Sequence, residues 1–213
     1  MSSATVRASW TWLAPTGLIL LSLFPILGGA ARLTQLTVGA EITRQNERFF
    51  DTPLPVYVHI VSVTVYALLG AFQFVPALRF RPWHRRAGRV LIVAGMLAAA
   101  SGIWLAFVYF SAEEGHVLLF VRLVIGSSMV ISLTFGVFAI VRARDAVRHG
   151  AWMTRAYAIA AAAGTEALLS IGPEIVAGPS EGIRQIVLTT AAWVINLAAA
   201  EWVIRRRTQV RSS

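Results

Sequence analysis

The sequence contains no cysteine and no lysine, and few charged residues of either sign. The absence of cysteine excludes disulfides, thiolate nucleophiles and metal or iron–sulfur sites with cysteine ligands. Only 14% of the 213 residues are charged and 57% are hydrophobic, whereas about a quarter of the residues of a soluble domain are charged. Because so few charges cannot cover a folded chain in water, the sequence predicts that lipid surrounds most of it.

The basic residues are all arginine and give a formal net charge of +9. They lie in short clusters between apolar runs and form neither a basic arm nor a charged helix face, so we expect no nucleic acid as a partner. A soluble enzyme is disfavoured as well, because the sequence has no phosphate-binding loop and no recognisable nucleophile–base motif. These absences leave a membrane protein whose partners are the lipid bilayer and small molecules.

Six apolar segments are long enough to cross a bilayer as helices, which takes about 20 residues each. Each must be helical, because an isolated span satisfies its backbone hydrogen bonds internally only as a helix. The sequence therefore predicts an all-α, polytopic membrane bundle of about six transmembrane helices. The segments are 12–31, 55–78, 88–110, 117–141, 152–172 and 185–204. Residues 1–54 then form a first helix with an outer loop, 55–204 a five-helix core, and 205–213 a basic tail.

Prolines mark two of the predicted helix ends. Pro53 and Pro55 mark the start of the second span, and Pro173 and Pro179 follow the fifth, where helices should start or stop. The segment between the first two spans, 33–54, is the longest loop and mixes acidic with aromatic residues. We expect this segment to form an amphipathic cap over the outer mouth of the bundle.

The arginines are unequally divided between the two faces that the spans define. One face has fourteen arginines, and the other has four together with seven of the ten acidic residues. Because arginine is enriched in cytoplasmic loops, both termini are predicted to be cytoplasmic. The fourteen are Arg7, Arg79, Arg81, Arg85, Arg86, Arg89, Arg142, Arg144, Arg148, Arg155, Arg205, Arg206, Arg207 and Arg211. The four are Arg32, Arg44, Arg48 and Arg184, and the acids are Glu41, Glu47, Asp51, Glu113, Glu114, Glu174 and Glu181.

Two charged residues of opposite sign lie away from the ends of their spans, where ionisable side chains are costly and are candidates for functional sites. Arg122 in the fourth span and Glu166 in the fifth lie at similar depth, each about 9 Å below the outer end at about 1.5 Å per residue. The sequence predicts that they form an ion pair. This pair either joins two helices or forms a polar site reached from outside, with Thr165, Ser127 and Ser128 nearby.

Further polar residues are predicted to join helices in the inner half. Gln73 and Asn196 lie at similar depth, and Arg155 and Glu201 both lie near the cytoplasmic ends of their helices. Interhelical hydrogen bonds of this kind hold membrane helices together and contribute around 1 kcal/mol each. We interpret all four as structural.

The four histidines lie in two pairs on alternating spans. His59 and His116 begin the second and fourth spans on the outer side, and His84 and His149 begin the third and fifth on the inner side. Two b-type haems across a bilayer need such pairs, one imidazole from each side of each iron. His84 and His149 are the stronger candidates for iron ligands. The alternative is that the histidines are interfacial residues without a ligand.

Glycines repeat every seven residues in the third span. Gly88, Gly95 and Gly102 share one face with His84, and a face without side chains could hold a flat macrocycle. The other interpretation is close helix packing, with the small residues 160–164 of the fifth span as the partner surface.

Two segments combine histidine, tryptophan and arginine at a helix start on the inner side, 82–89 and 149–155. A helix N-terminus with arginines binds anions, and basic pockets between helices bind lipid headgroups. Trp152 and Arg155 would belong to such a site. Tryptophan at this depth also serves as an ordinary membrane anchor.

The same segments resemble a known family. The blocks are His59-Ile60, Gly70-Ala71-Phe72-Gln73-Phe74, Trp83-His84-Arg85-Arg86-Ala87-Gly88-Arg89, Ser101-Gly102, Arg144-Asp145, His149-Gly150-Ala151-Trp152-Met153-Thr154-Arg155-Ala156-Tyr157-Ala158 and Asn196 to Trp202. Over residues 55–204 the sequence resembles DUF2306, a family of uncharacterised bacterial membrane proteins, which implies a multi-pass protein of the cytoplasmic membrane and no particular reaction. His116 matches no block of the family. The alternating histidines are also similar in layout to cytochrome b561 proteins.

Three functional hypotheses follow from these patterns. The first is a haem b electron carrier that links a quinol or a cytoplasmic donor to an outer acceptor, a membrane oxidoreductase of cytochrome b type. The second is a transporter or binder of a small or lipidic ligand, such as a quinone, built around Arg122, Glu166 and the inner arginines. The third is a structural or accessory subunit. The sequence leaves the oligomeric state open.

Overall fold

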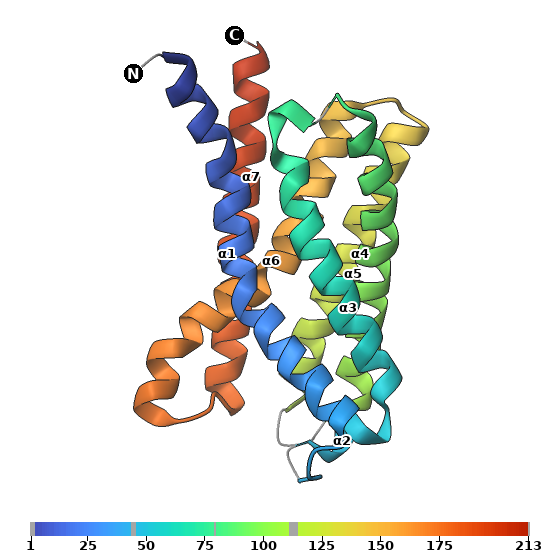
Figure 1. The fold of residues 1–213 in the computed structure, drawn as a ribbon, viewed down its shortest axis with the longest axis vertical. Coiled ribbons are helices and arrows are strands. Elements are labelled where there is room, and N and C mark those ends of the chain that lie inside the picture. The colour runs from blue at the N-terminus through green and yellow to red at the C-terminus, as the bar shows by residue number, and fades with distance from the viewer. Residues whose placement is uncertain (1–2, 44–45, 79, 111–114, 213) are drawn as a thin grey trace.

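The computed structural model describes residues 3–43, 46–78, 80–110 and 115–212, with side chains of the terminal helices described from Trp12 and as far as Gln209. The described part of the chain consists of helices and turns without a strand (Figure 1). Six helices are long and apolar enough to cross a membrane, which confirms the predicted all-α polytopic bundle. They are α1 (Ser3–Val38), α3 (Pro53–Ala71), α4 (Pro82–Val108), α5 (Gly115–Val141), α6 (Ala146–Ala177) and α7 (Gly182–Ser212), with a short helix α2 (Glu47–Asp51) and two 3₁₀ turns, η1 (Phe72–Phe74) and η2 (Pro76–Leu78).

Proline chemistry explains where α3 and α4 begin and where α3 ends. Pro53 and Pro82 are the first residues of their helices, a position where the missing N–H costs nothing. The predicted second span ran to residue 78, but α3 ends at Ala71. Pro76 disfavours the helical conformation in the residue before it, and Val75 accordingly takes an extended conformation with ψ of 114°. The chain then continues in short 3₁₀ turns.

Of the two prolines predicted to mark the end of the fifth span, Pro173 lies inside α6, which continues to Ala177 and ends two residues before Pro179. A proline near the end of a helix removes one hydrogen bond to the preceding turn, and a long helix tolerates that loss more easily there than at its centre. Gly178 ends the helix with φ of 73°, a conformation that suits glycine. At the other end the Asp145 side chain accepts a hydrogen bond of 2.9 Å from the backbone N–H of Arg148, the usual arrangement of a helix cap.

Helices α3 to α6 form an antiparallel four-helix bundle in which each helix packs against the next and α3 also contacts α6. Helix α1 lies against α3 and α6, and α7 packs mainly against α6 (Figure 1). The centre of the bundle is filled by aromatic and aliphatic side chains from four helices. They include Tyr66, Leu91, Met129, Leu133 and Tyr157.

Glycines allow the closest approaches between these helices. Gly70 of α3 lies under the ring of Tyr157, whose hydroxyl donates a 2.8 Å hydrogen bond to the carbonyl of Ala67. Gly164 of α6 lies against the backbone of α1 at Leu21. The small residues of α6 were predicted to pack against the glycines of α4, but at Gly164 the partner is α1.

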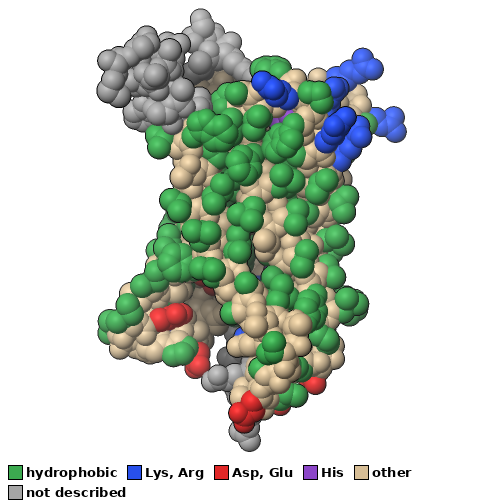
Figure 2. Space-filling model, in the orientation of Figure 1, with side chains coloured by type: hydrophobic (Ala, Val, Ile, Leu, Met, Phe, Trp, Pro, Cys, Tyr) green, Lys and Arg blue, Asp and Glu red, His purple; other side chains and the backbone are tan. Residues whose placement is uncertain are grey.

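The two ends of the bundle differ in charge. Both termini lie at one end, where Figure 2 shows arginine side chains, and acidic side chains gather at the opposite end. We call these the basic end and the acidic end. The division agrees with the predicted arginine asymmetry. Arg44, Arg79, Glu113 and Glu114, which entered that prediction, lie outside the described residues, as do the side chains of Arg7 and Arg211.

The sides of the bundle between these ends are apolar (Figure 2). Large hydrophobic side chains are exposed there on several helices, including Trp104, Phe120, Phe138 and Trp202. Such a surface is stable only against hydrocarbon, because in water an apolar patch this large would drive aggregation. The chain is therefore a multi-pass membrane protein in contact with the lipid bilayer.

Candidate functional site

A cavity of about 380 Å³ lies inside the bundle in the half nearer the acidic end. Helices α3 to α7 all contribute to its walls, and α2 contributes two residues. Small side chains on facing helices make the space, among them Ala98, Gly102 and Ala106 of α4 and Ala160 and Ala163 of α6. The cavity is thus largely apolar and is built into the fold of the bundle.

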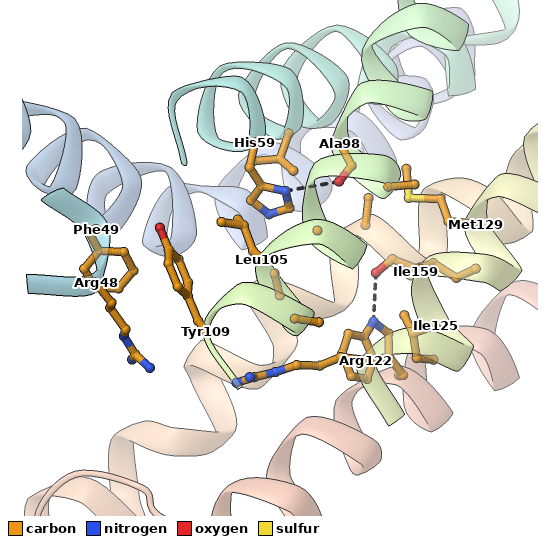
Figure 3. Close-up of a pocket in the computed structure, with 18 residues that line it drawn as sticks. Arg48, Phe49, His59, Ala98, Leu105, Tyr109, Arg122, Ile125, Met129 and Ile159 are labelled. Carbon is orange, nitrogen blue, oxygen red and sulfur yellow. Dashed lines mark hydrogen bonds between the residues drawn. The ribbon is translucent and has the colours of Figure 1, made fainter. Parts of the chain in front are cut away.

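Polar side chains are concentrated toward one end of the cavity. Arg122 of α5 and Arg48 of α2 extend toward the same edge, near the ring of Tyr109 (Figure 3). His59 of α3 lines the same cavity from another side. The structure therefore brings together two residues, Arg122 and His59, that the sequence had assigned to different hypotheses.

The loop between α1 and α3 covers this polar edge. Phe49 of α2 contacts the ring of Tyr109 edge-to-face, with centroids 5.1 Å apart, and the guanidinium of Arg32 lies 4.0 Å from the centre of the Phe49 ring. The Tyr109 hydroxyl donates a 3.3 Å hydrogen bond to the carbonyl of Thr52. The expected cap over the mouth of the bundle is present in the described residues of this loop, and it supplies Arg48 to the cavity.

His59 is held by its Nδ1 atom. This nitrogen lies 3.1 Å from the carbonyl oxygen of Ala98 and 3.1 Å from the hydroxyl oxygen of Ser101, both on α4. Gly102 leaves room for the ring, because a β-carbon there would lie 3.2 Å from Cε1 of His59. Helix α4 thus fixes the imidazole at the cavity wall.

The sequence predicts an ion pair between Arg122 and Glu166, and the structure shows other surroundings for each. The Glu166 carboxylate accepts a 2.5 Å hydrogen bond from the hydroxyl of Thr189 on α7. The ion pair between the two stays a prediction. Arg122 instead lines the cavity, whereas the polar contact of Glu166 links α6 to α7.

Two further polar contacts join α6 to α7. Arg155 and Glu201 form two hydrogen bonds, Nε to Oε1 at 2.5 Å and a terminal nitrogen to Oε2 at 3.1 Å, as expected for a structural pair. The Arg155 guanidinium also lies 4.8 Å from the centre of the Trp152 ring. Asn196 donates to the hydroxyl of Thr165 at 2.6 Å. The sequence correctly predicted that Arg155 and Asn196 join helices, but the partner of Asn196 is Thr165 and not Gln73.

Gln73 lies away from this contact, in the 3₁₀ turn that follows α3. Its side-chain nitrogen is buried and has no hydrogen-bond partner in the described structure. The similar depth of Gln73 and Asn196 along their spans therefore does not bring them together. Depth alone does not determine which sides of two helices face each other.

A haem between two histidines needs two imidazoles that face one cavity. Of the histidines, His59 lines the cavity described above. His116, its expected partner, packs against Phe110 with ring centroids 5.0 Å apart. The residues around this cavity therefore do not fit a haem with two histidine ligands.

The inner pair lies near the basic end on helices with different main neighbours. His84 begins α4, which packs mainly against α3 and α5, and His149 begins α6, which packs mainly against α5 and α7. Nδ1 of His149 lies 2.8 Å from the carbonyl oxygen of Gly136 on α5. This contact joins α5 to α6, and the fold gives His149 a structural role.

The glycine face of α4 does not offer a flat surface for a macrocycle. Gly95 lies against Tyr66 and Gly102 lies beside His59, so side chains of α3 occupy two of its three positions. A β-carbon at Gly88 would meet no atom within 4 Å. Close packing between helices, the second interpretation of the glycine repeat, accounts for Gly95 and Gly102.

Sequence reasoning missed Tyr109 and Trp193, both of which line the cavity. Trp193 is held by a 3.1 Å hydrogen bond from its Nε1 atom to the carbonyl of Ile159. Neither residue lies in a motif or is charged, so the sequence distinguishes them from the other aromatic residues of the spans only by position. Arg48 served only to predict the topology from the sequence, and it was not predicted to line a cavity.

Comparison with known proteins bears on the family and not on a reaction. The family described as "Predicted membrane protein (DUF2306)" matches residues 56–204. No curated protein and no solved structure matches the chain. The matched residues include α4, α5 and α6 entirely and most of α3 and α7. Every residue of the cavity wall lies in this matched range except Arg48 and Phe49. The chain therefore belongs to the DUF2306 family of membrane proteins.

Proposed function

We propose that this protein binds a small amphipathic anion, a molecule with an apolar body and a carboxylate or phosphate group, inside the membrane. The observation that carries the proposal is the cavity itself, which is apolar over most of its wall and has Arg48 and Arg122 at one edge. Ligand sites are typically cavities of this size class, about 300–1,000 Å³, with few polar groups that fix the orientation of the ligand.

The chemistry of the edge favours an anion over a neutral molecule. Guanidinium groups match the geometry of carboxylates and phosphates and form charge-assisted hydrogen bonds with them. The apolar wall has no such preference and would contact the body of the ligand. A molecule with both parts places its anionic group at the arginines and its apolar body against the apolar wall.

Orientation in the membrane completes the proposal. If the arginine-rich end is cytoplasmic, the acidic end faces the outside of a bacterial cytoplasmic membrane. The cavity then lies in the outer half of the bilayer under the cap formed by α2, and the ligand enters from the outer side.

The test is a binding series with the purified full chain in lipid nanodiscs, by calorimetry. Decyl phosphate, decanol and decyltrimethylammonium share one apolar chain and differ in charge. We expect decyl phosphate to bind most tightly and Arg122→Gln to weaken it by about 10- to 100-fold, the loss of one charge-assisted hydrogen bond. Arg86→Gln, at the start of α4 and outside the cavity, is the matched control and should bind as the unchanged protein does.

Two outcomes would overturn the proposal. One is equal affinity for the three probes, which would show that the arginines do not select charge. The other is binding of a short-chain quinone with no binding of decyl phosphate, which would identify a neutral quinone as the partner.

A further inference from the structure

The hydrogen bonds of His59 determine which of its nitrogens carries the proton. The carbonyl oxygen of Ala98 can only accept, so Nδ1 must donate to it. The hydroxyl of Ser101 donates to the carbonyl of Leu97 at 2.5 Å, which leaves its oxygen to accept from Nδ1 as well. Both neighbours of Nδ1 therefore require a proton on that atom.

The other ring nitrogen, Nε2, is then a hydrogen-bond acceptor. A neutral imidazole carries one proton, and a charged ring would add a third positive group to an apolar cavity that already has two guanidinium groups in its wall, which is unfavourable. Figure 3 shows the second nitrogen directed away from Ala98 and toward the interior of the site. The cavity thus presents donors at its Arg48 and Arg122 edge and an acceptor at His59.

We infer that His59 selects for a ligand with a hydroxyl or N–H group, which donates a hydrogen bond to Nε2. This inference rests on the proposed function, because it concerns the same cavity and specifies its ligand further. The ligand would be an amphipathic anion with a separate hydrogen-bond donor. His59 is a specificity-determining residue in this account, and Ala98 and Ser101 are positioning residues that hold its tautomer.

The experiment compares 4-heptylphenol with its methyl ether, 4-heptylanisole, in nanodiscs. The two probes have similar apolar bodies, but the ether has no proton to donate. Because both probes partition into lipid, the quantity compared is the ratio of their affinities in each variant, in which partition cancels. We expect His59→Phe to lower the preference for the phenol by about three- to tenfold. His59→Gln, which keeps an amide oxygen near the position of Nε2, should retain most of it.

His116→Phe is the matched control, because this histidine lies against Phe110 and outside the cavity wall. A second measurement needs no variant of His59. In the protein labelled with ¹⁵N-histidine, both His59 and His149 should show a protonated Nδ1, because each faces a backbone carbonyl. Only the unprotonated Nε2 of His59 should shift with the phenol and not with the ether. An equal probe ratio in the unchanged protein and His59→Phe, or a proton on Nε2, would overturn the inference.

The same data separate this inference from the proposed function. Loss of selectivity for decyl phosphate with a retained phenol preference would refute the anion and leave the role of His59 intact. Charge selection without any phenol preference would refute the role of His59 and leave the proposed binding of an anion intact.

Discussion

The contact between α1 and α6 at Gly164 provides a direct test of the packing. A β-carbon at this position would lie 2.8 Å from the carbonyl carbon of Leu21 and closer still to its oxygen. Because these are backbone atoms of a helix, rotation of a side chain cannot relieve the clash, and α1 must move. Gly164→Ala therefore combines two opposite effects: a gain of about 0.5–1 kcal/mol from replacing glycine in a helix and an overpacking cost of about 1–3 kcal/mol. With the cost at the top of its range, we expect a net loss of about 2 kcal/mol.

Gly172→Ala is the matched control, since Gly172 lies in the same helix and a β-carbon there would meet no atom within 4 Å. The control should gain about 0.5–1 kcal/mol from the helix effect alone. Both variants are compared by reversible unfolding in mixed micelles with increasing SDS, followed by tryptophan fluorescence. If Gly164→Ala is as stable as Gly172→Ala, α1 does not pack against α6 at this point.

Three further predictions concern the polar pairs, the topology and the histidines. A double-mutant cycle with Arg155→Gln and Glu201→Gln should give a coupling of about 0.5–1 kcal/mol in the same unfolding assay, because both side chains are partly exposed, 27% and 37%. Additive effects would show that the pair contributes nothing. A reporter fused after Arg206 should be active in the cytoplasm, and a periplasmic signal would reverse the topology. After expression with a haem precursor, we expect no Soret band that depends on His84 and His149, whereas a band lost in both alanine variants would favour an electron carrier.

The sequence predicted the helices well because hydrophobicity along the chain is a local property. All six predicted spans overlap the helices of the structure, and the acidic and basic ends follow from residue counts. The errors lie at helix ends where proline is involved. A proline ended α3 early at Ala71 and did not end α6 at Pro173, because its effect depends on which backbone hydrogen bonds are lost and on where in the helix they lie.

The site was harder to predict because it depends on the rotation of each helix about its axis. The sequence prediction paired His59 with His116 and Arg122 with Glu166, because the residues of each pair lie at similar depth in their spans. Packing instead places His59 and Arg122 in one cavity and directs the carboxylate of Glu166 to Thr189. Rotation is decided by contacts such as Gly95 against Tyr66, and a single sequence does not contain this pairwise information.

The central claim, that the cavity binds an amphipathic anion, is tested most directly by photolabelling. A decanoic acid with a diazirine in its chain is crosslinked to the protein in nanodiscs, and the labelled residues are identified by mass spectrometry. We predict labels on cavity residues such as Ala99, Met129 and Ala163, lost when decyl phosphate is added in excess. Labels confined to lipid-facing residues such as Trp104 and Phe138, and unchanged by the competitor, would contradict it.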